Sequence, residues 1–272
     1  MDAKTGDMSA WMARWGLEAD GYPFSTPYTR SVLAPVLYRG EPAMLKVAGA
    51  PEEVRGAAMM AWWAGDGAAP VLAHEGPAIL LARAQTPDAL PRMAFDGEDD
   101  RATAILCDVA AKLHRPRAQP PPAEAVPLAP WLDALQAAAG EGELHARAAG
   151  LAAELLSAPE DIAVLHGDIT HANVLDFGDG GWLAIDPKGL VGERGYDFAN
   201  LFRSPTVQMA TPQRFRRQLD LVAQLAGLDR TRLLKWTIVH GVIAVVWAIR
   251  DGHKVGRLGL RFPEMALAEL SR

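Results

Sequence analysis

Two carboxylates and one amide at fixed spacing constrain the fold of this chain more than any other feature. Asp168 and Asn173 lie five residues apart, and Asp186 follows Asn173 by thirteen residues. Between Asn173 and Asp186, two short apolar runs flank the Gly-rich segment 178–181, which is the pattern of a β-hairpin. A hairpin returns the chain to its starting point, so we expect Asn173 and Asp186 to meet in space beside Asp168.

This arrangement predicts phosphoryl transfer. The catalytic loop of protein kinases carries an Asp and an Asn at the same separation, with a metal-binding Asp further along the chain. Asn173 and Asp186 would give Mg²⁺ the hard oxygen ligands that it prefers, and the ion would neutralise the γ-phosphate of ATP. Asp168 would then orient the acceptor hydroxyl and take its proton. His166, two residues earlier, would brace the loop by hydrogen bonding.

A literal Asp-Phe-Gly triplet beginning at Asp176 matches the metal motif of kinases, but its position argues against that role. It begins three residues after Asn173, which leaves no room for the chain to double back. We therefore interpret Asp176 as part of the hairpin and Asp186 as the metal-binding acid.

The composition is that of an ordinary soluble globular chain. Of its 272 residues, 50% are hydrophobic and 22% are charged, and the net charge of -6 argues against a nucleic-acid partner. A single cysteine excludes a disulfide framework and indicates a reducing compartment. The longest apolar run, 239–249, is too short to span a membrane, and residues 1–4 lack the basic start of a signal peptide. We expect no membrane association and a cytoplasmic location.

Strand patterns occupy the first third of the chain, and helical patterns occupy the rest. The elements predicted in the first part are a helix at 8–17, strands at 30–37 and 43–47 joined by a turn at 38–41, a helix from Pro51, and strands at 70–74 and 77–83. The helices predicted in the second part lie at 100–115, 130–139, 142–157, 196–202, 212–226 and 230–250, with a stiff connector at 116–130 and a short final helix. We therefore predict an α+β, bilobal protein-kinase-like fold, with a small antiparallel-sheet N-lobe at 1–83 and a mainly helical C-lobe at 84–272.

Lys46 stands between apolar neighbours on a predicted strand, where a kinase places the lysine that grips the α- and β-phosphates of ATP. A solvent-facing strand lysine would look the same, but the matching catalytic loop favours the functional role. The carboxylate partner is expected on the next helix, where we favour Glu53 over Glu52 because Glu53 flanks the predicted apolar face. That face consists of Val54, Ala57, Ala58, Ala61 and Trp62. Alternatively, both acids only favour the helix dipole.

Asp197, in the segment 195–200, admits two interpretations. An aspartate at this position can cap the helix predicted at 196–202. Its carboxylate can instead hold the catalytic loop from beneath, and the sequence does not decide between the two.

The catalytic-loop and hairpin segments resemble those of a known family. Two motifs, His-Gly-Asp at 166–168 and Ile-Asp-Pro at 185–187, are similar to those of the aminoglycoside phosphotransferases. The longer string 181–193 is similar to the streptomycin and hydroxyurea phosphotransferase branch of that family. The resemblance covers most of the chain. It implies MgATP-dependent phosphorylation of a hydroxyl group on an aminoglycoside-like small-molecule acceptor, and a link to antibiotic resistance.

The resemblance also implies roles for individual residues. The catalytic base would be Asp168, the Mg²⁺ ligands Asn173 and Asp186, and the residues acting on the nucleotide phosphates Lys46 and Glu53.

The segment 247–252 lies where the family builds its acceptor pocket. Asp251 could contact the acceptor there, although an aspartate before a glycine at a helix end is also common turn chemistry. Arg250 stands where an acid would be expected for a polycationic acceptor.

Two other functions are open on the sequence alone. A metal-dependent hydrolase could use the cluster of His166, Asp168, His171 and Asp186, but it would leave Lys46 without a role. The second alternative is a catalytically silent nucleotide-binding homologue of the kinases, which would have no chemical need for both acids, the amide and the lysine. No pattern sets an oligomeric state.

Overall fold

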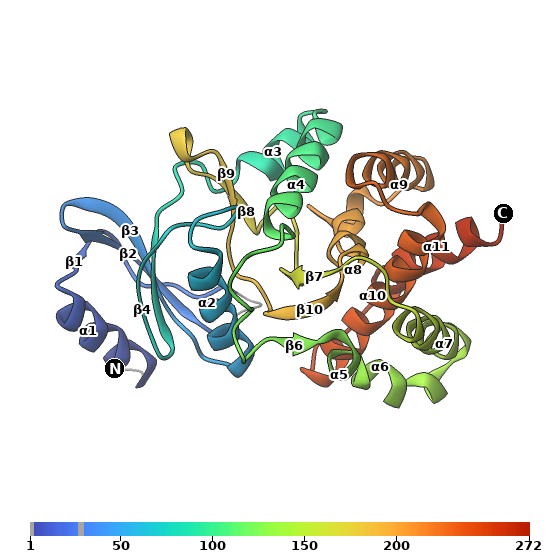
Figure 1. Ribbon diagram of the computed structural model, residues 1–272, viewed down its shortest axis with the longest axis horizontal. Helices are drawn as coiled ribbons and strands as arrows, with labels where there is room; N and C mark the ends of the chain where they lie inside the picture. The colour runs from blue at the N-terminus through green and yellow to red at the C-terminus, as the bar shows by residue number, and fades with distance from the viewer. Residues whose placement is uncertain (1–2, 27–29) are drawn as a thin grey trace.

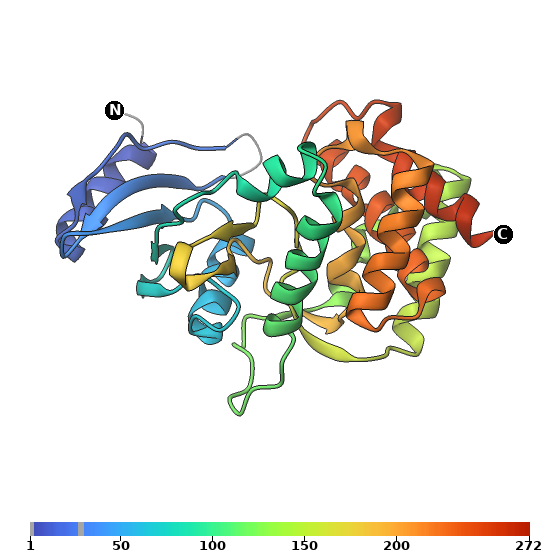
Figure 2. The same ribbon diagram turned by 90° about the horizontal axis from the view of Figure 1, so that it is seen from above.

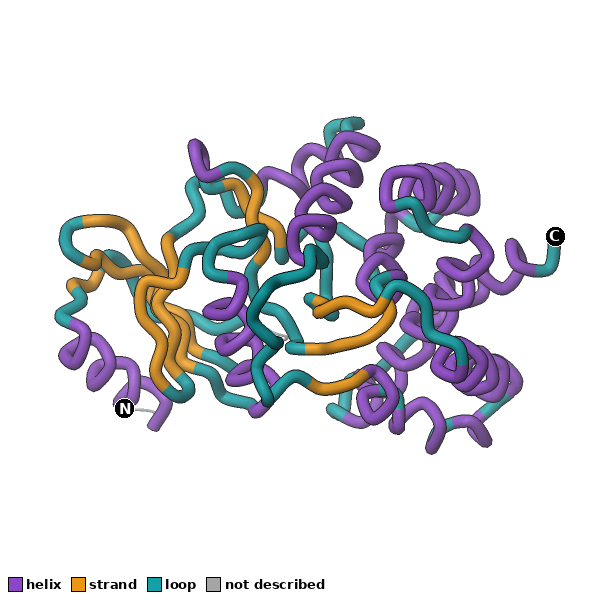
Figure 3. Tube along the Cα trace, viewed as in Figure 1, coloured by secondary structure: helices purple, strands orange, loops and turns teal. Residues whose placement is uncertain are grey.

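The main sheet and most of the helices lie toward opposite ends of the long axis of the molecule (Figure 1; Figure 3). The structure is a computed structural model that describes residues 3–26 and 30–272. A small lobe built on an antiparallel sheet lies at one end, and a lobe of packed helices lies at the other, which confirms the predicted α+β architecture. The sheet ends at Ala82 and the next helix, α3 (Ala89–Phe95), follows it. The lobe boundary at residue 83 stays a prediction.

The small-lobe sheet has the strand order β1-β2-β3-β5-β4, and all neighbouring strands are antiparallel. Its strands are β1 (Glu18–Ala19), β2 (Val32–Tyr38), β3 (Glu41–Val47), β4 (Val71–Glu75) and β5 (Ala78–Ala82). The predicted turn between β2 and β3 is confirmed. Its central residues, Arg39 and Gly40, have φ of 55° and 84°, the left-handed pair with which a two-residue hairpin turn matches the strand twist.

The two faces of the sheet meet different helices. Helix α1 (Ala3–Trp15) covers the face that carries Leu45 and Val47, and the ring centroids of its Trp11 and Trp15 lie 5.1 Å apart. Side chains alternate along a strand, so Lys46 of β3 points to the opposite face. The alternation therefore turns Lys46 away from α1 and toward the large lobe.

Helix α2 (Pro51–Trp63) packs on that opposite face, but its buried side differs from the predicted one. Of the predicted apolar positions only Ala57 is buried, and the buried set is Glu53, Gly56, Ala57, Met59, Met60 and Trp63. Gly56 explains the difference, because a Cβ at this position would lie 2.2 Å from the carbonyl oxygen of Pro187. The glycine lets the helix backbone approach the segment after Asp186 closely, and this contact sets the buried face.

Helix α10 (Arg230–Arg250) forms the centre of the large lobe. The helices packed against it are α6 (Asp133–Ala137), α7 (Glu143–Ser157), α8 (Gly195–Ala199), α9 (Pro212–Ala226) and α11 (Arg261–Leu270). Helix α4 (Asp99–Leu113) packs on α9. Among the residues that the structure describes, one helix is long and apolar enough to cross a membrane, and it is α10. However, 67% of its apolar stretch is buried inside the protein. The predicted bounds of α9 and α10 are confirmed.

Several short elements of the large lobe are absent from the prediction. They are helix α3 and the strands β6 (Val126–Pro127), β7 (Ile162–Leu165) and β10 (Leu190–Glu193). The three strands form a sheet in the order β6-β10-β7. The helix predicted at 130–139 is broken at Leu132 into α5 (Leu128–Trp131) and α6 (Asp133–Ala137). A strand such as β6, with two residues, has no periodicity, and only its pairing with β10 defines it.

The predicted hairpin is confirmed. Strands β8 (Val174–Asp176) and β9 (Trp182–Ala184) are antiparallel, with Val174 opposite Ala184. The carboxylate of Asp176 accepts a hydrogen bond from the backbone N–H of Gly178 (2.8 Å), so this acid supports the turn. Seen from above, the hairpin (yellow) lies between the sheet and the helices (Figure 2). It attaches to the small lobe because the N–H of Ala184 donates to Gly67 and its carbonyl accepts from Ala69, both at 2.9 Å.

Candidate active site

The catalytic loop 166–173 connects β7 to β8 and is held from beneath by Asp197. The Asp197 carboxylate accepts hydrogen bonds from the backbone N–H groups of His166 (2.8 Å) and Gly167 (2.6 Å). The Nε2 of His114 lies 2.8 Å from the same carboxylate. Asp197 lies inside α8 rather than at its N-cap. Of the two interpretations of this residue, the loop-supporting one is therefore observed.

Replacing Asp197 with asparagine is expected to destabilise the fold, because the new amide would direct a donor at groups that are themselves donors. Asp197 is 1% exposed, and each buried polar group left unpaired costs about 1–3 kcal/mol. Burial alone would raise the pKa of Asp197, but the hydrogen bonds from the His114 side chain and the Gly167 backbone help to lower it from its ordinary value of 3.8. The stabilisation is therefore present at neutral pH and is lost as the pH falls through the lowered pKa.

Urea unfolding at neutral and acid pH checks this prediction, with exposed Asp133→Asn as the control. The Asp197→Asn variant should have a lower free energy of unfolding at neutral pH and a weaker dependence on pH than the control. Equal unfolding free energies of the two variants would contradict the supporting role of Asp197.

His166 links the catalytic loop to the strand end before Asp186. Its ring is fully buried, with Nε2 2.7 Å from the carbonyl oxygen of Ile185 and Nδ1 accepting the backbone N–H of Asp168 at 3.2 Å. An accepting Nδ1 fixes the neutral tautomer, in which Nε2–H donates to Ile185. Burial lowers the pKa of His166, which keeps the ring neutral. Both ring nitrogens are therefore engaged in bracing the loop.

Asp168 is the acid at the centre of the site. Its Oδ1 accepts a hydrogen bond from Asn200 Nδ2 (2.6 Å), and its Oδ2 accepts one from Asn173 Nδ2 (3.1 Å). The Nζ of Lys188 lies 3.6 Å from Oδ2. The Asp168 side chain is still 28% exposed. Two amides therefore fix the orientation of a carboxylate that a ligand from solvent can reach.

Asn173 and Asp186 meet at the open end of the hairpin. The backbone N–H of Ile185 donates to the carbonyl oxygen of Asn173 at 2.9 Å, which extends the pairing of β8 and β9 by one step. Asp186 follows with φ of 61°. Aspartate tolerates this left-handed conformation better than most residues, and such backbone is common at functional sites. The predicted fold-back of the chain is therefore present.

The donor atoms at this end of the hairpin fit Mg²⁺. The Nδ2 of Asn173 donates to the backbone oxygen (2.9 Å) and Oδ2 of Asp168, which leaves the amide oxygen as a ligand. Burial alone would raise the pKa of Asp186, but Lys46 and Lys188 outweigh it and lower that pKa, so the carboxylate is charged. An amide oxygen and a carboxylate are hard ligands of the kind that Mg²⁺ takes together with the phosphates of a nucleotide.

Lys46 forms an ion pair with Asp186, and its predicted pairing with Glu53 stays a prediction. Glu53 is buried in the first turn of α2, where it accepts hydrogen bonds from the backbone N–H groups of Gly49 (3.0 Å) and Arg30 (3.2 Å). Glu53 therefore satisfies one backbone N–H of the loop before α2 and one of the segment before β2. The role of Glu53 toward the nucleotide stays a prediction.

Asp251 ends α10 and is not joined to the cluster around Asp168. Within the described ranges its exposed carboxylate pairs with Arg30, whose Nη2 is 3.6 Å away, rather than with Asp168 or Lys188. Arg30 precedes β2, so this ion pair connects the large lobe to the small lobe. The acceptor contact of Asp251 stays a prediction.

The residues of the alternative hydrolase do not form a metal site. His171 is fully buried, with Nδ1 2.8 Å from the hydroxyl of Ser204, and burial lowers the pKa of His171 to about 4. Within residues 3–26 and 30–272, no group of three or more His, Cys, Asp and Glu side chains is placed to hold a metal ion. This arrangement weighs against a metal-dependent hydrolase.

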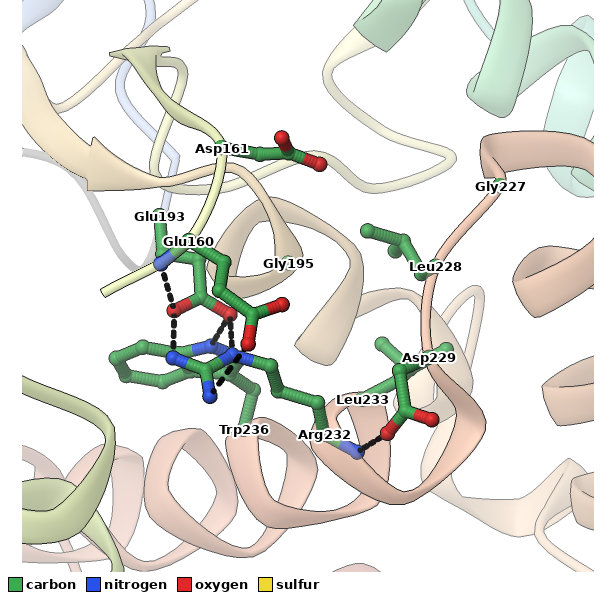
Figure 4. A pocket seen from close by; sticks show the side chains of 10 residues that line it. All are labelled: Glu160, Asp161, Glu193, Gly195, Gly227, Leu228, Asp229, Arg232, Leu233 and Trp236. Atoms are coloured by element: carbon green, nitrogen blue, oxygen red, sulfur yellow. Dashed lines mark hydrogen bonds and ion pairs between the residues drawn. The ribbon is translucent and has the colours of Figure 1, made fainter. Parts of the chain in front are cut away.

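A pocket of the large lobe contains none of the predicted site residues (Figure 4). Its centre is the ion pair of Arg232 with Glu193, in which Nε and Nη2 each lie 2.6 Å from a carboxylate oxygen. Trp236 Nε1 donates to the same carboxylate at 2.7 Å. Glu193 closes the string 181–193 that resembles the streptomycin branch. The structure gives it an anchoring role, because it fastens the end of β10 to α10.

Asn200 and Lys188 contact Asp168 but are absent from the predicted site. Lys188 follows Asp186 by two residues, and Asn200 follows Asp197 by three. The one available signal was their closeness in sequence to acids already singled out. Only the fold shows that their side chains turn toward Asp168.

Comparison with known proteins identifies the family. The family model described as aminoglycoside/hydroxyurea antibiotic resistance kinase matches residues 14–252. The streptomycin 3″-kinase of Klebsiella pneumoniae is 44% identical over 247 residues, which cover 89% of this chain and 92% of that protein. The streptomycin 6-kinase of Streptomyces griseus is 32% identical over 257 residues, which cover 88% of this chain and 81% of that protein.

The fold has solved counterparts. A thermostable mutant of aminoglycoside phosphotransferase APH(4)-Ia, in a ternary complex with ADP and hygromycin B, matches with a TM-score of 0.63 and 15% identity, covering 97% of this chain and 96% of that chain. At this identity the likeness concerns the fold alone, and it confirms the predicted protein-kinase-like fold. The family match and the relatives show that this chain belongs to the aminoglycoside/hydroxyurea antibiotic resistance kinases, a family of phosphotransferases.

Proposed function

We propose that this protein is an ATP-dependent small-molecule kinase that transfers the γ-phosphate to a hydroxyl group of an aminoglycoside-like, streptomycin-type acceptor. One observation carries the proposal. The ion pairs of Asp168, Lys188, Asp186 and Lys46 form a continuous chain from the catalytic loop to the small lobe. The 44% identity to a streptomycin 3″-kinase supports the acceptor class.

In the proposed mechanism, Asp168 orients the acceptor hydroxyl and takes its proton as the oxygen attacks phosphorus. The amides of Asn173 and Asn200 keep the carboxylate aimed, and the neutral ring of His166 holds the loop that carries it. All of these residues act by positioning except Asp168, which receives the proton.

On the nucleotide side, Lys46 would move from Asp186 to the α- and β-phosphates of ATP. Asn173 and Asp186 would hold Mg²⁺, which when bound neutralises the charge of the phosphates. Glu53 would act indirectly, by ordering the backbone at Gly49 beside β3.

The proposal extends to the organisation and location of the protein. Residues 1–83 would bind the nucleotide, and residues 84–272 would carry the catalytic loop and the acceptor site, with Asp251 as an acceptor contact. The net charge of -6 favours a cationic small molecule over nucleic acid. The burial of α10 supports a core helix rather than a membrane span, and we propose that the protein acts in the cytoplasm.

The test is phosphate transfer from labelled ATP to streptomycin, with hydroxyurea and hygromycin B as comparison acceptors. We expect an acceptor-dependent turnover of about 1–100 s⁻¹ with the physiological class of acceptor, the range of kinases. Mass spectrometry should find one phosphoryl group on the acceptor. Phosphate release that is independent of every acceptor would favour a hydrolase, and nucleotide binding without turnover would favour the silent homologue.

A further inference from the structure

Lys188 lies in the gap between the two acids of the site. Its Nζ is 3.6 Å from Oδ2 of Asp168 and 3.9 Å from Oδ2 of Asp186. Lys46, the lysine of the small lobe, pairs with the other oxygen of Asp186, Oδ1. The two lysines therefore approach Asp186 at different oxygens, and Lys188 is the one that also pairs with Asp168.

The backbone fixes where the Lys188 side chain starts. Its N–H donates to the carbonyl oxygen of His166 at 2.6 Å, so the segment after Asp186 runs beside the catalytic loop. Gly167, with φ of 82°, makes this approach possible, because a Cβ there would lie 3.0 Å from the Cβ of Lys188. On its other side, Pro187 packs against Gly56 of α2. The segment is clamped between α2 and the catalytic loop.

Lys188 faces the two acids and is accessible from solvent. Its Nζ forms ion pairs with both Asp168 and Asp186. The side chain is 26% exposed, so a ligand that enters the gap between the two acids meets an ammonium group.

We propose that Lys188 is a further catalytic residue, whose ammonium group binds the oxygens of the γ-phosphoryl group as it passes from ATP to the acceptor. This inference rests on the proposed function. If Asp168 holds the acceptor and Asp186 helps to hold the nucleotide, the transferred phosphorus must cross the gap between them. The Nζ of Lys188 lies in that gap.

The chemistry needs a charge at this point rather than a proton carrier. The bond from the γ-phosphorus to the bridging oxygen of ADP breaks, the bond to the acceptor oxygen forms, and the acceptor proton passes to Asp168. Lys188 keeps its protons throughout. Negative charge spreads over the equatorial oxygens of the transition state, and a cation already in place stabilises it without reorganisation.

A purely structural role is the competing explanation. Lys188 would then only separate the like charges of Asp168 and Asp186, and its loss would lower stability and nucleotide binding together. The two roles differ in the ligand that they affect. MgADP lacks the transferred group, whereas MgADP with aluminium fluoride carries a mimic of that group in flight.

The experiment compares Lys188→Met with Lys188→Arg and with Lys235→Met, which removes a lysine ion-paired to Glu154 on another face of the large lobe. We expect Lys188→Met to lower kcat by about 10²–10³-fold, the loss caused by removing one preorganised donor to a transition state. The Kd of MgADP and the Tm should be unchanged, while tight binding of the aluminium fluoride complex should be lost. Lys188→Arg, which keeps the charge, should recover part of both losses, and Lys235→Met should match the wild type.

Wild-type kcat and wild-type binding of the fluoride complex in Lys188→Met would overturn the inference. So would parallel losses of MgADP binding, Tm and kcat, since they identify a structural role. The fluoride complex needs no acceptor and tests Lys188 even when no tested acceptor is phosphorylated by the wild type. A wild-type protein that phosphorylates none of the tested acceptors would count against the proposed function alone.

Discussion

Replacing Asp168 with asparagine is expected to lower the turnover of acceptor phosphorylation by about 10²–10⁴-fold and to leave the affinity for MgADP unchanged. An amide is nearly the size of a carboxylate but cannot take the acceptor proton. Both oxygens of Asp168 accept from amide donors, those of Asn200 and Asn173, so the substitution also turns one of these contacts repulsive. Basicity and orientation are lost together, while Lys46 and Asp186 are untouched.

Steady-state kinetics at saturating ATP and acceptor measure the turnover, and calorimetry measures the binding of MgADP. The matched control is Asp176→Asn, the same chemical change within the Asp-Phe-Gly triplet of the neighbouring hairpin. Asp176 supports a turn through the N–H of Gly178, so the control should retain its turnover. Equal losses in the two variants, or wild-type turnover in Asp168→Asn, would show that Asp168 is not the base.

The parts of the site that the sequence could predict are those fixed by local structure. Asn173 and Asp186 are brought together by a hairpin formed of the residues between them, so their spacing alone predicts that they meet. The same reason applies to helices α9 and α10, which begin after side-chain caps at Thr211 and Asp229. Each of these predictions depends on contacts between near neighbours in the chain.

Contacts across long stretches of chain could not be predicted, because no spacing rule describes them. Asn200 donates to Asp168 over 32 residues, and Lys46 pairs with Asp186 over 140 residues. The first contact exists only after the large lobe has folded, and the second only after both lobes have folded and come together. The role of Asp197 could not be predicted for a related reason. An aspartate can cap a helix or accept hydrogen bonds from a distant pair of backbone N–H groups, and the sequence does not distinguish the two roles.

The buried face of α2 illustrates why the periodicity of small residues does not predict which side of a helix is buried. Alanine fits either side of a helix, so a pattern of alanines does not identify the packed side. The packed side is chosen by Gly56, the residue that can approach the backbone of Pro187. A glycine does not count as apolar in such a pattern, so the pattern cannot place Gly56 on the buried face.

Replacing Asp186 with asparagine is expected to remove the Mg²⁺ dependence of nucleotide binding. Even substitutions behind the ligands of a metal site lower metal affinity by about 10–100-fold, and here the charged ligand itself is neutralised. Asparagine is the suitable replacement because the φ of Asp186 is 61°. Asparagine tolerates this left-handed backbone, whereas alanine would add a strain of about 1–2 kcal/mol.

Because Lys46 and Lys188 both pair with Asp186, we expect more than a simple loss of nucleotide affinity in Asp186→Asn. In the wild type, Lys46 and Lys188 both pair with Asp186, and the neutral variant would leave Lys46 without its carboxylate. ATP should therefore bind Asp186→Asn in the presence of a chelator at least as tightly as it binds the wild type, but Mg²⁺ should no longer tighten it. Calorimetric titration with and without Mg²⁺ measures both effects, and Asp179→Asn, on the exposed turn of the same hairpin, should keep the full Mg²⁺ enhancement. If Asp186→Asn kept it too, Asp186 would serve only to anchor Lys46 to the large lobe, and the metal would have to be held elsewhere.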